Sequence, residues 1–125
     1  MKNTTHLILG MLALTFGMEV KAQIQLPSVF SDGMVLQQNS KVAVWGWGNP
    51  SETLMILSEW NPGDTVRTVV DNQGRWKAEV PTGRAGGPYT LEVKGGNDSR
   101  KLSDVMLGEV WLCSGQSNME WSANM

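Results

Sequence analysis

Histidine and cysteine are almost missing from this sequence, although they are the side chains that most often carry metal or thiol chemistry. The 125 residues include one cysteine, Cys113, and one histidine, His6. A single cysteine excludes a disulfide within the chain. No His pair, Cys pair or clustered acidic loop has the spacing of a zinc or calcium site, and no glycine-rich loop precedes a predicted helix. We therefore expect neither a metal nor another cofactor.

Runs of positive charge are also missing. The sequence has ten Lys and Arg residues and twelve Asp and Glu residues, which gives a net charge of −2. Without a basic block, the sequence has no electrostatic footprint for nucleic acid or an anionic membrane. We expect small neutral or polar partners, and the sequence does not indicate an oligomeric state.

The apolar run near the N-terminus is too short to cross a membrane. Leu7–Phe16 has about half of the ~20 apolar residues that a spanning helix needs, follows Lys2 and precedes Val20-Lys21-Ala22. This pattern predicts a signal peptide over residues 1–22, cleaved after Ala22, rather than a membrane anchor. We expect export to the periplasm or the exterior, and the mature chain then has a net charge of −3.

Residues 23–104 have the pattern of a separate β domain. In Arg75–Val80 every second residue is apolar, and Tyr89–Lys94 repeats this alternation, which is typical of strands with one wet face. The other segments with strand composition are Met34–Gln37, Lys41–Trp47, Thr53–Ser58 and Thr65–Asp71. Short strands divided by Gly, Pro, Asn and Asp turns predict a β-sandwich of the immunoglobulin-like or jelly-roll type.

The pattern changes after Asp104. Val105–Cys113 is apolar except for Glu109, which predicts a strand buried on both faces, as in a parallel α/β sheet, with Cys113 packed inside it. A polar turn, Ser114–Ser117, follows, and Asn118 is placed to open a helix. We interpret residues 105–125 as the start of a second domain, of which the sequence holds only the first part. The chain as a whole is predicted to be mainly β.

Ser117 is the candidate nucleophile. A sharp turn between a strand and a helix exposes a hydroxyl, and the helix start supplies backbone N–H groups to a developing oxyanion. The turn lacks the second glycine of Gly-x-Ser-x-Gly, so the fold associated with that motif is not indicated. A serine after a strand also commonly caps the next helix, and this alternative remains open on the motif alone.

The segment Gly108–Trp121 closely resembles the first sequence block of bacterial sialate O-acetylesterases, which belong to the SGNH hydrolase superfamily. The resemblance extends over residues 24–121. Its other matching segments are Leu26–Gln37, Val44–Trp47 and Gly87–Leu91. Gln38 departs from the pattern, because a basic residue is expected there.

The resemblance implies serine acyl-enzyme hydrolysis of O-acetyl groups on sialic acid or a related acetylated sugar. Ser117 would be the nucleophile, and its backbone N–H would be one oxyanion donor. The superfamily's other oxyanion donors and its Asp-x-x-His pair belong to later sequence blocks that these 125 residues do not contain. We therefore predict that this chain alone is inactive, and which sugar is deacetylated stays open.

Several neighbouring residues have two interpretations. Asn118 contacts the acyl group or caps the helix, with neither favoured. Trp121, Trp45 and Trp47 are predicted to pack in cores rather than to stack on sugars. The alternative function for the whole chain is a β-sandwich module that binds carbohydrate or protein without chemistry.

Overall fold

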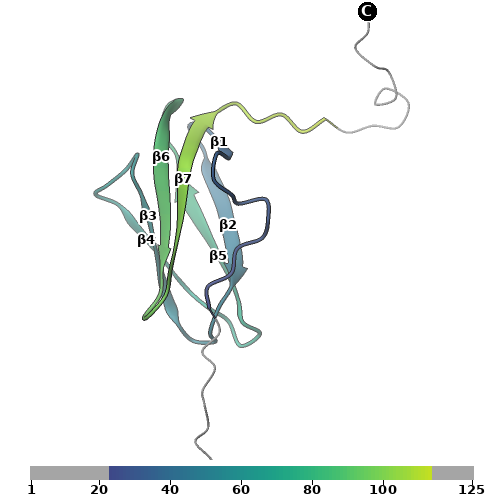
Figure 1. The fold of residues 1–125 in the computed structure, drawn as a ribbon, viewed down its shortest axis with the longest axis vertical. Helices are drawn as coiled ribbons and strands as arrows, with labels where there is room; N and C mark the ends of the chain where they lie inside the picture. Colours follow the sequence, from purple (N-terminus) through teal and green to yellow (C-terminus); the bar gives the residue numbers. More distant parts are fainter. Residues whose placement is uncertain (1–22, 114–125) are drawn as a thin grey trace, which may run out of the picture.

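The computed structural model describes residues 23–113, which form strands and connecting turns around one hydrophobic core (Figure 1). The predicted signal peptide, Ser117, Asn118 and Trp121 lie outside these described residues. Between residues 23 and 113 there is no helix that could cross a membrane. The strands are β1 (Val35–Gln37), β2 (Lys41–Trp47), β3 (Thr53–Ser58), β4 (Thr65–Val69), β5 (Arg75–Pro81), β6 (Gly86–Lys94) and β7 (Ser99–Gly108).

The strands form a five-stranded sheet, ordered β1-β7-β6-β3-β4, and a two-stranded sheet of β2 and β5. Every pairing is antiparallel except that of β1 with β7, which is parallel. The Thr68 hydroxyl of β4 donates to the Lys77 carbonyl of β5 at 2.8 Å. This contact links the two sheets at one edge, and together they curl around the core. The predicted mainly β fold is confirmed.

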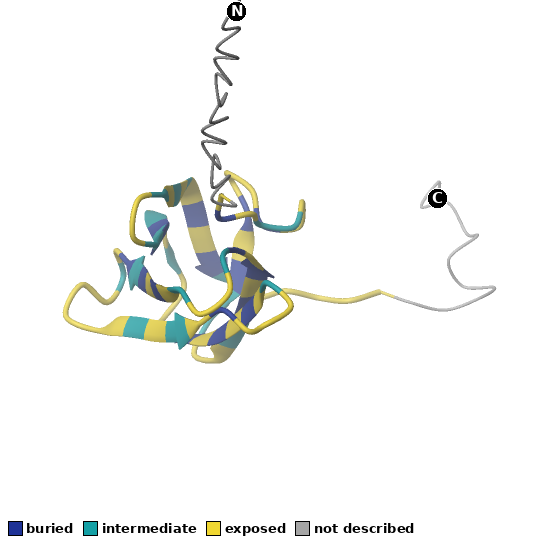
Figure 2. Cartoon of the chain, turned by 90° about the horizontal axis from the view of Figure 1, so that it is seen from below, coloured by how far each residue is buried: buried dark blue, intermediate teal, exposed yellow. Residues whose placement is uncertain are grey.

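The alternation predicted for residues 75–80 is present in β5. Trp76, Ala78 and Val80 are buried, whereas the residues between them are exposed, so the strand is striped in Figure 2. In β6, Leu91 and Val93 are buried. Period-two burial follows from the pleat, which directs successive side chains to opposite faces. The bounds predicted for β2 and β3 are also those observed.

The prediction of a strand over Val105–Cys113 buried on both faces is wrong. β7 begins at Ser99, continues across the expected boundary after residue 104 and ends at Gly108. Only Val105 and Leu107 of this run are buried in the core, whereas Trp111 and Leu112 are 82% and 93% exposed. Cys113 is exposed as well, so its predicted packing inside a strand is also wrong.

A β-bulge explains the change of pattern at Asp104. Leu91 pairs with Leu102 and Tyr89 pairs with Val105, so two steps along β6 match three steps along β7. Asp104 has a φ of 55°, a left-handed value that Asp tolerates better than most residues. The extra residue shifts the phase of burial within one strand. The break therefore marks an irregularity of this domain, and the start of a second domain stays a prediction.

Two leucines of the run that was predicted as one strand test this assignment. Leu107→Ala is expected to lower the free energy of unfolding by about 2–5 kcal/mol, because it removes a buried side chain from the core. Leu112→Ala, at an exposed position, is the matched control and should change stability by less than about 0.5 kcal/mol. Urea unfolding of both variants measures the difference. Equal losses would contradict the assignment, because they would show that the two leucines do not differ in burial.

Candidate functional site

The described residues contain none of the bases that a serine nucleophile requires in a Ser-His-Asp arrangement. Residues 23–113 have no histidine, and they contain no group of three or more His, Cys, Asp or Glu side chains that could hold a metal. The predicted nucleophile Ser117 and its neighbour Asn118 fall outside this part of the chain. The structure therefore bears on the candidate site through the segment that leads to Ser117.

That segment is fastened to β1 by the Glu109 clasp, which we define as Gln37, Gln38 and Glu109. The side-chain amides of Gln37 and Gln38 donate to the two oxygens of the Glu109 carboxylate at 2.9 and 2.7 Å. The backbone N–H of Val110 donates to the Gln37 side chain at 2.9 Å. Residues 109 and 110 are thus held to β1 after β7 has ended.

The clasp accounts for the neutral residue Gln38 at a position where the family resemblance predicts a basic residue. A basic side chain at this position would face the carboxylate of Glu109, and the amide of Gln38 makes that contact as a neutral donor. The carbonyl oxygen of the same side chain also accepts from the backbone N–H of Ala85 at 2.9 Å, which a basic side chain could not do. The hydrogen bonds from Gln37 and then Gln38 lower the pKa of Glu109, because they stabilise its charged form. From the sequence alone, Glu109 was only the one charged residue in an apolar run, and no contact was predicted for it.

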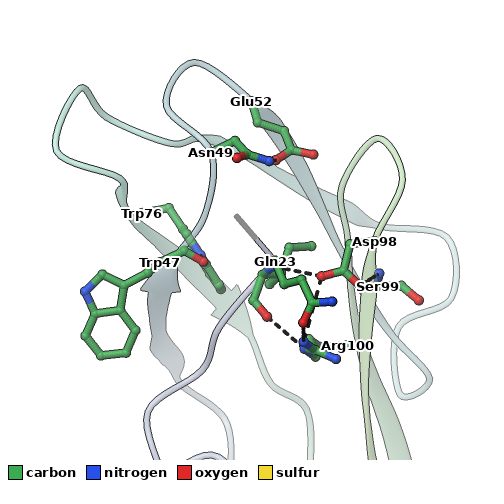
Figure 3. A network of polar contacts seen from close by, with 9 residues as sticks. Gln23, Trp47, Asn49, Glu52, Trp76, Asp98, Ser99 and Arg100 are labelled. Carbon is green, nitrogen blue, oxygen red and sulfur yellow. Dashed lines mark hydrogen bonds and ion pairs between the residues drawn. The ribbon is translucent and has the colours of Figure 1, made fainter. Parts of the chain in front are cut away.

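A cavity of about 470 Å³ lies at the end of the fold where the described residues begin, beside the polar contacts drawn in Figure 3. Its walls carry carboxylates and amides from three separate segments. The residues that line the cavity are Gln23, Asn49, Pro50, Ser51, Glu52, Gly96, Asn97 and Asp98. The side chains of this lining can form hydrogen bonds with a polar molecule. The cavity was not predicted from the sequence, because the segments that line it are about 25 to 75 residues apart.

The carboxylates of this cavity already have structural partners. Glu52 accepts from the backbone N–H of Gly96 at 2.7 Å, and Asp98 accepts from that of Ile24 at 2.8 Å. Arg100 donates to the Ile24 carbonyl at 2.7 Å. These bonds hold the first described residues against the β6–β7 turn. The cavity therefore has a structural role that accounts for its charged groups.

The prediction that Trp45 and Trp47 pack inside the domain is wrong. Their side chains are 41% and 43% exposed, on the face of β2 that points away from the core. In Figure 3 the ring of Trp47 is directed away from the polar network of Gln23 and Arg100. The side chains that β2 turns inward are those of Val42, which is half-buried, and Val44, which is fully buried, and Gly46 also lies on this side.

The glycine between the two tryptophans has a steric reason. Gln25 and Trp47 exchange backbone hydrogen bonds of 2.9 Å in both directions. A Cβ at Gly46 would overlap the Gln25 carbonyl oxygen, so no larger residue fits there without moving this segment. The Trp-Gly-Trp sequence thus places a third chain segment against β2 and leaves the two indoles outside.

Comparison with known proteins relates the chain to carbohydrate esterases. Human sialate O-acetylesterase is 33% identical over 103 residues, which are 74% of this chain and 19% of that protein. The mouse sialate O-acetylesterase is 30% identical over 105 residues, 78% of this chain and 19% of that protein. The predicted resemblance is confirmed, and the chain spans about a fifth of the length of these relatives.

One solved structure is similar to this chain in both fold and sequence. A carbohydrate acetylesterase from Xanthomonas citri superposes with a TM-score of 0.69 at 39% identity, over 78% of this chain and 22% of that chain. No family model matches the chain. Fold and sequence therefore point to the same group of enzymes.

The Glu109 clasp is expected to depend on pH. Because the folded pKa of Glu109 is lowered below its ordinary value of 4.5, the clasp stabilises the fold above that value and is lost as pH falls through the folded pKa. NMR titration of the Val110 amide should show this transition. Gln37→Met should raise the pKa of Glu109, because it removes the largest contribution to the shift, whereas Gln73→Met, in a distant turn, should not. An unchanged pKa in the first variant would refute the clasp.

Proposed function

We propose, from the relationship of this chain to sialate O-acetylesterases, that it forms the front part of an exported carbohydrate esterase. The enzyme would remove O-acetyl groups from sialic acid or a related acetylated sugar. The observation that carries the proposal is the similarity of about three quarters of the chain to proteins named as such esterases, at 30–39% identity. In this proposal residues 23–104 form most of a β-sandwich accessory domain, and the catalytic SGNH domain begins in the segment after β7.

Ser117 is the proposed nucleophile. Its hydroxyl would attack the acetyl carbonyl and lose its proton to a base, and the sugar hydroxyl would leave with a proton. Water would then hydrolyse the acetyl-serine to acetate and free enzyme. The backbone N–H of Ser117 would stabilise the negative oxygen of each tetrahedral intermediate. The clasp supports this role, because it bonds Glu109, eight residues before the serine, to residues at the end of β1.

An exposed apolar surface near the end of β7 supports the proposal of a further domain. Val35 and Met106 are paired across β1 and β7, and their side chains are 48% and 37% exposed. Val110 and Trp111, which follow β7, are 52% and 82% exposed. Apolar surface of this kind is typical of faces that another part of a protein covers. We propose that the remainder of the catalytic domain packs here.

A second candidate function is a module that binds carbohydrate without chemistry. The observation that favours it is the exposure of Trp45 and Trp47 on one face of β2. The two functions are compatible in one polypeptide, because the tryptophans belong to the β domain and Ser117 follows it in sequence.

The catalytic role of Ser117 is tested in the polypeptide read from the coding DNA past codon 125, where we expect an Asp-x-x-His segment. In that protein Ser117→Ala should lower kcat/KM for an O-acetylated sialic acid at least about a thousand-fold, because the acyl-enzyme cannot form. Ser103→Ala, an exposed serine of β7, should have no effect. Release of acetate measures both variants, and an active Ser117→Ala enzyme would contradict the mechanism.

The 125-residue chain alone is expected to be inactive. Its one histidine, His6, lies in the predicted signal peptide, and base assistance is worth about 10²–10⁴-fold. Hydrolysis of p-nitrophenyl acetate by this chain should be no faster than by its Ser117→Ala variant. Turnover that requires the serine would overturn the proposal that the base lies in later sequence.

A further inference from the structure

The outer face of the two-stranded sheet combines exposed aromatic and charged side chains. We call it the tryptophan face. Its members alternate with buried residues along β2 and β5. They are Lys41, Trp45, Trp47, Arg75, Lys77 and Glu79. The register places Trp45 opposite Lys77 and Trp47 opposite Arg75. Each indole therefore has a cationic side chain as its cross-strand neighbour on the same face.

The ring of Trp45 and the backbone of Trp47 each have a further contact. The ring of Phe30 meets the Trp45 ring edge to face, with centroids 4.7 Å apart and planes at 77°. The backbone of Trp47 bonds to Gln25 on one side of β2, and its carbonyl also accepts from the Trp76 indole at 3.3 Å. A surface that is fixed before a ligand arrives loses little conformational entropy on binding. The Trp45 ring is held by a ring contact and the Trp47 backbone by hydrogen bonds, so this pair of exposed indoles is suited to binding.

The charge of this face is opposite to that of the chain. Three cations, Lys41, Arg75 and Lys77, share the face with one anion, Glu79, while the whole chain has a net charge of −2. The Nε of Arg75 also lies 3.6 Å from the Oδ2 of Asp71, in the turn before β5. This ion pair offsets part of the charge of Arg75. Lys77 has no such ion pair among the described residues. A ligand with negative charge would be attracted to this face more than to the rest of the surface, where the acidic residues outnumber the basic ones.

We propose that the tryptophan face binds a glycan that carries carboxylate groups. The indoles would stack against the apolar C–H faces of neighbouring sugars, since residues two apart on a strand are separated by about 6.8 Å. Lys77 and Arg75 would contact the carboxylates through charge-assisted hydrogen bonds. The choice of a glycan as ligand rests on the proposed function, whereas the sign of its charge follows from the face itself. The bound glycan would hold acetylated sugars near the catalytic domain.

Titration of the 125-residue chain with polysialic acid, followed by isothermal calorimetry and tryptophan fluorescence, tests the proposal. We expect binding that weakens as NaCl is raised, and dextran, a neutral glycan, should bind at least ten-fold less tightly. Trp47→Ala and Lys77→Glu should each weaken binding at least ten-fold, while Lys77→Arg should retain it. Trp111→Ala, at an exposed tryptophan outside the face, is the matched control and should bind as the unaltered chain does.

Several results would overturn the proposal. They are a failure to bind polysialic acid, equally tight binding of dextran, and unchanged affinity in Lys77→Glu. Because Lys77 is exposed, that variant keeps the test decisive even if Trp47→Ala fails to fold. If Trp45 and Trp47 lose their accessibility to acrylamide in the longer polypeptide, the face is an interdomain contact and the proposal is wrong.

The binding proposal and the esterase proposal can fail separately. In the longer polypeptide, Ser117→Ala should bind polysialic acid as tightly as the unaltered protein, and Trp47→Ala should hydrolyse p-nitrophenyl acetate at the unaltered rate. Loss of activity in Trp47→Ala would show that the face serves catalysis and not glycan binding alone, which would contradict the inference.

Discussion

The parallel pairing of β1 with β7 is the constraint on which the candidate site depends. It joins Val35–Gln37 to Met106–Gly108, segments about 70 residues apart, and makes β1 one edge strand of the five-stranded sheet. Gln37 and Gln38 reach Glu109 only because this pairing places them beside the end of β7. The position of Glu109 and Val110 beyond β7 is therefore set by residues at the end of β1.

The two faces of β2 and β5 have separate roles in this small domain. The inward side chains of these strands complete the core, so their outward side chains are free to differ in chemistry from the rest of the surface. The clasp belongs to the β1–β7 edge, whereas the tryptophan face belongs to the other sheet. The outward face of β2 and β5 and the clasp share the core but no contact residue, so either can be changed without altering the contacts of the other.

The errors in the sequence interpretation have specific physical causes. In Lys41–Trp47 both alternating sets are mostly apolar, and the larger side chains, Trp45 and Trp47, are on the set that faces outward, so the pattern predicts the wrong face. Gln25 decides which set faces inward, because its backbone lies against β2 at Gly46 and leaves no space for a side chain there. In Val105–Cys113 the hydrophobic run continues past the end of the strand, and the bulge at Asp104 hides the continuity with Ser99–Ser103. The contact of Gln25 with β2 and the pairing of β7 with β6 at the bulge both join segments that are distant in sequence.

Composition and alternation alone determined that this chain is mainly β, where most of its strands lie and which residues of β5 are buried, since the pleat imposes a period of two on any half-buried strand. The motif around Ser117 supplied the relationship to the esterases. Only the tertiary structure decided which face of β2 is exposed, where β7 begins and what Glu109 contacts. Those outcomes depend on partners brought together from distant parts of the chain, and their identity is not encoded in any local run of residues.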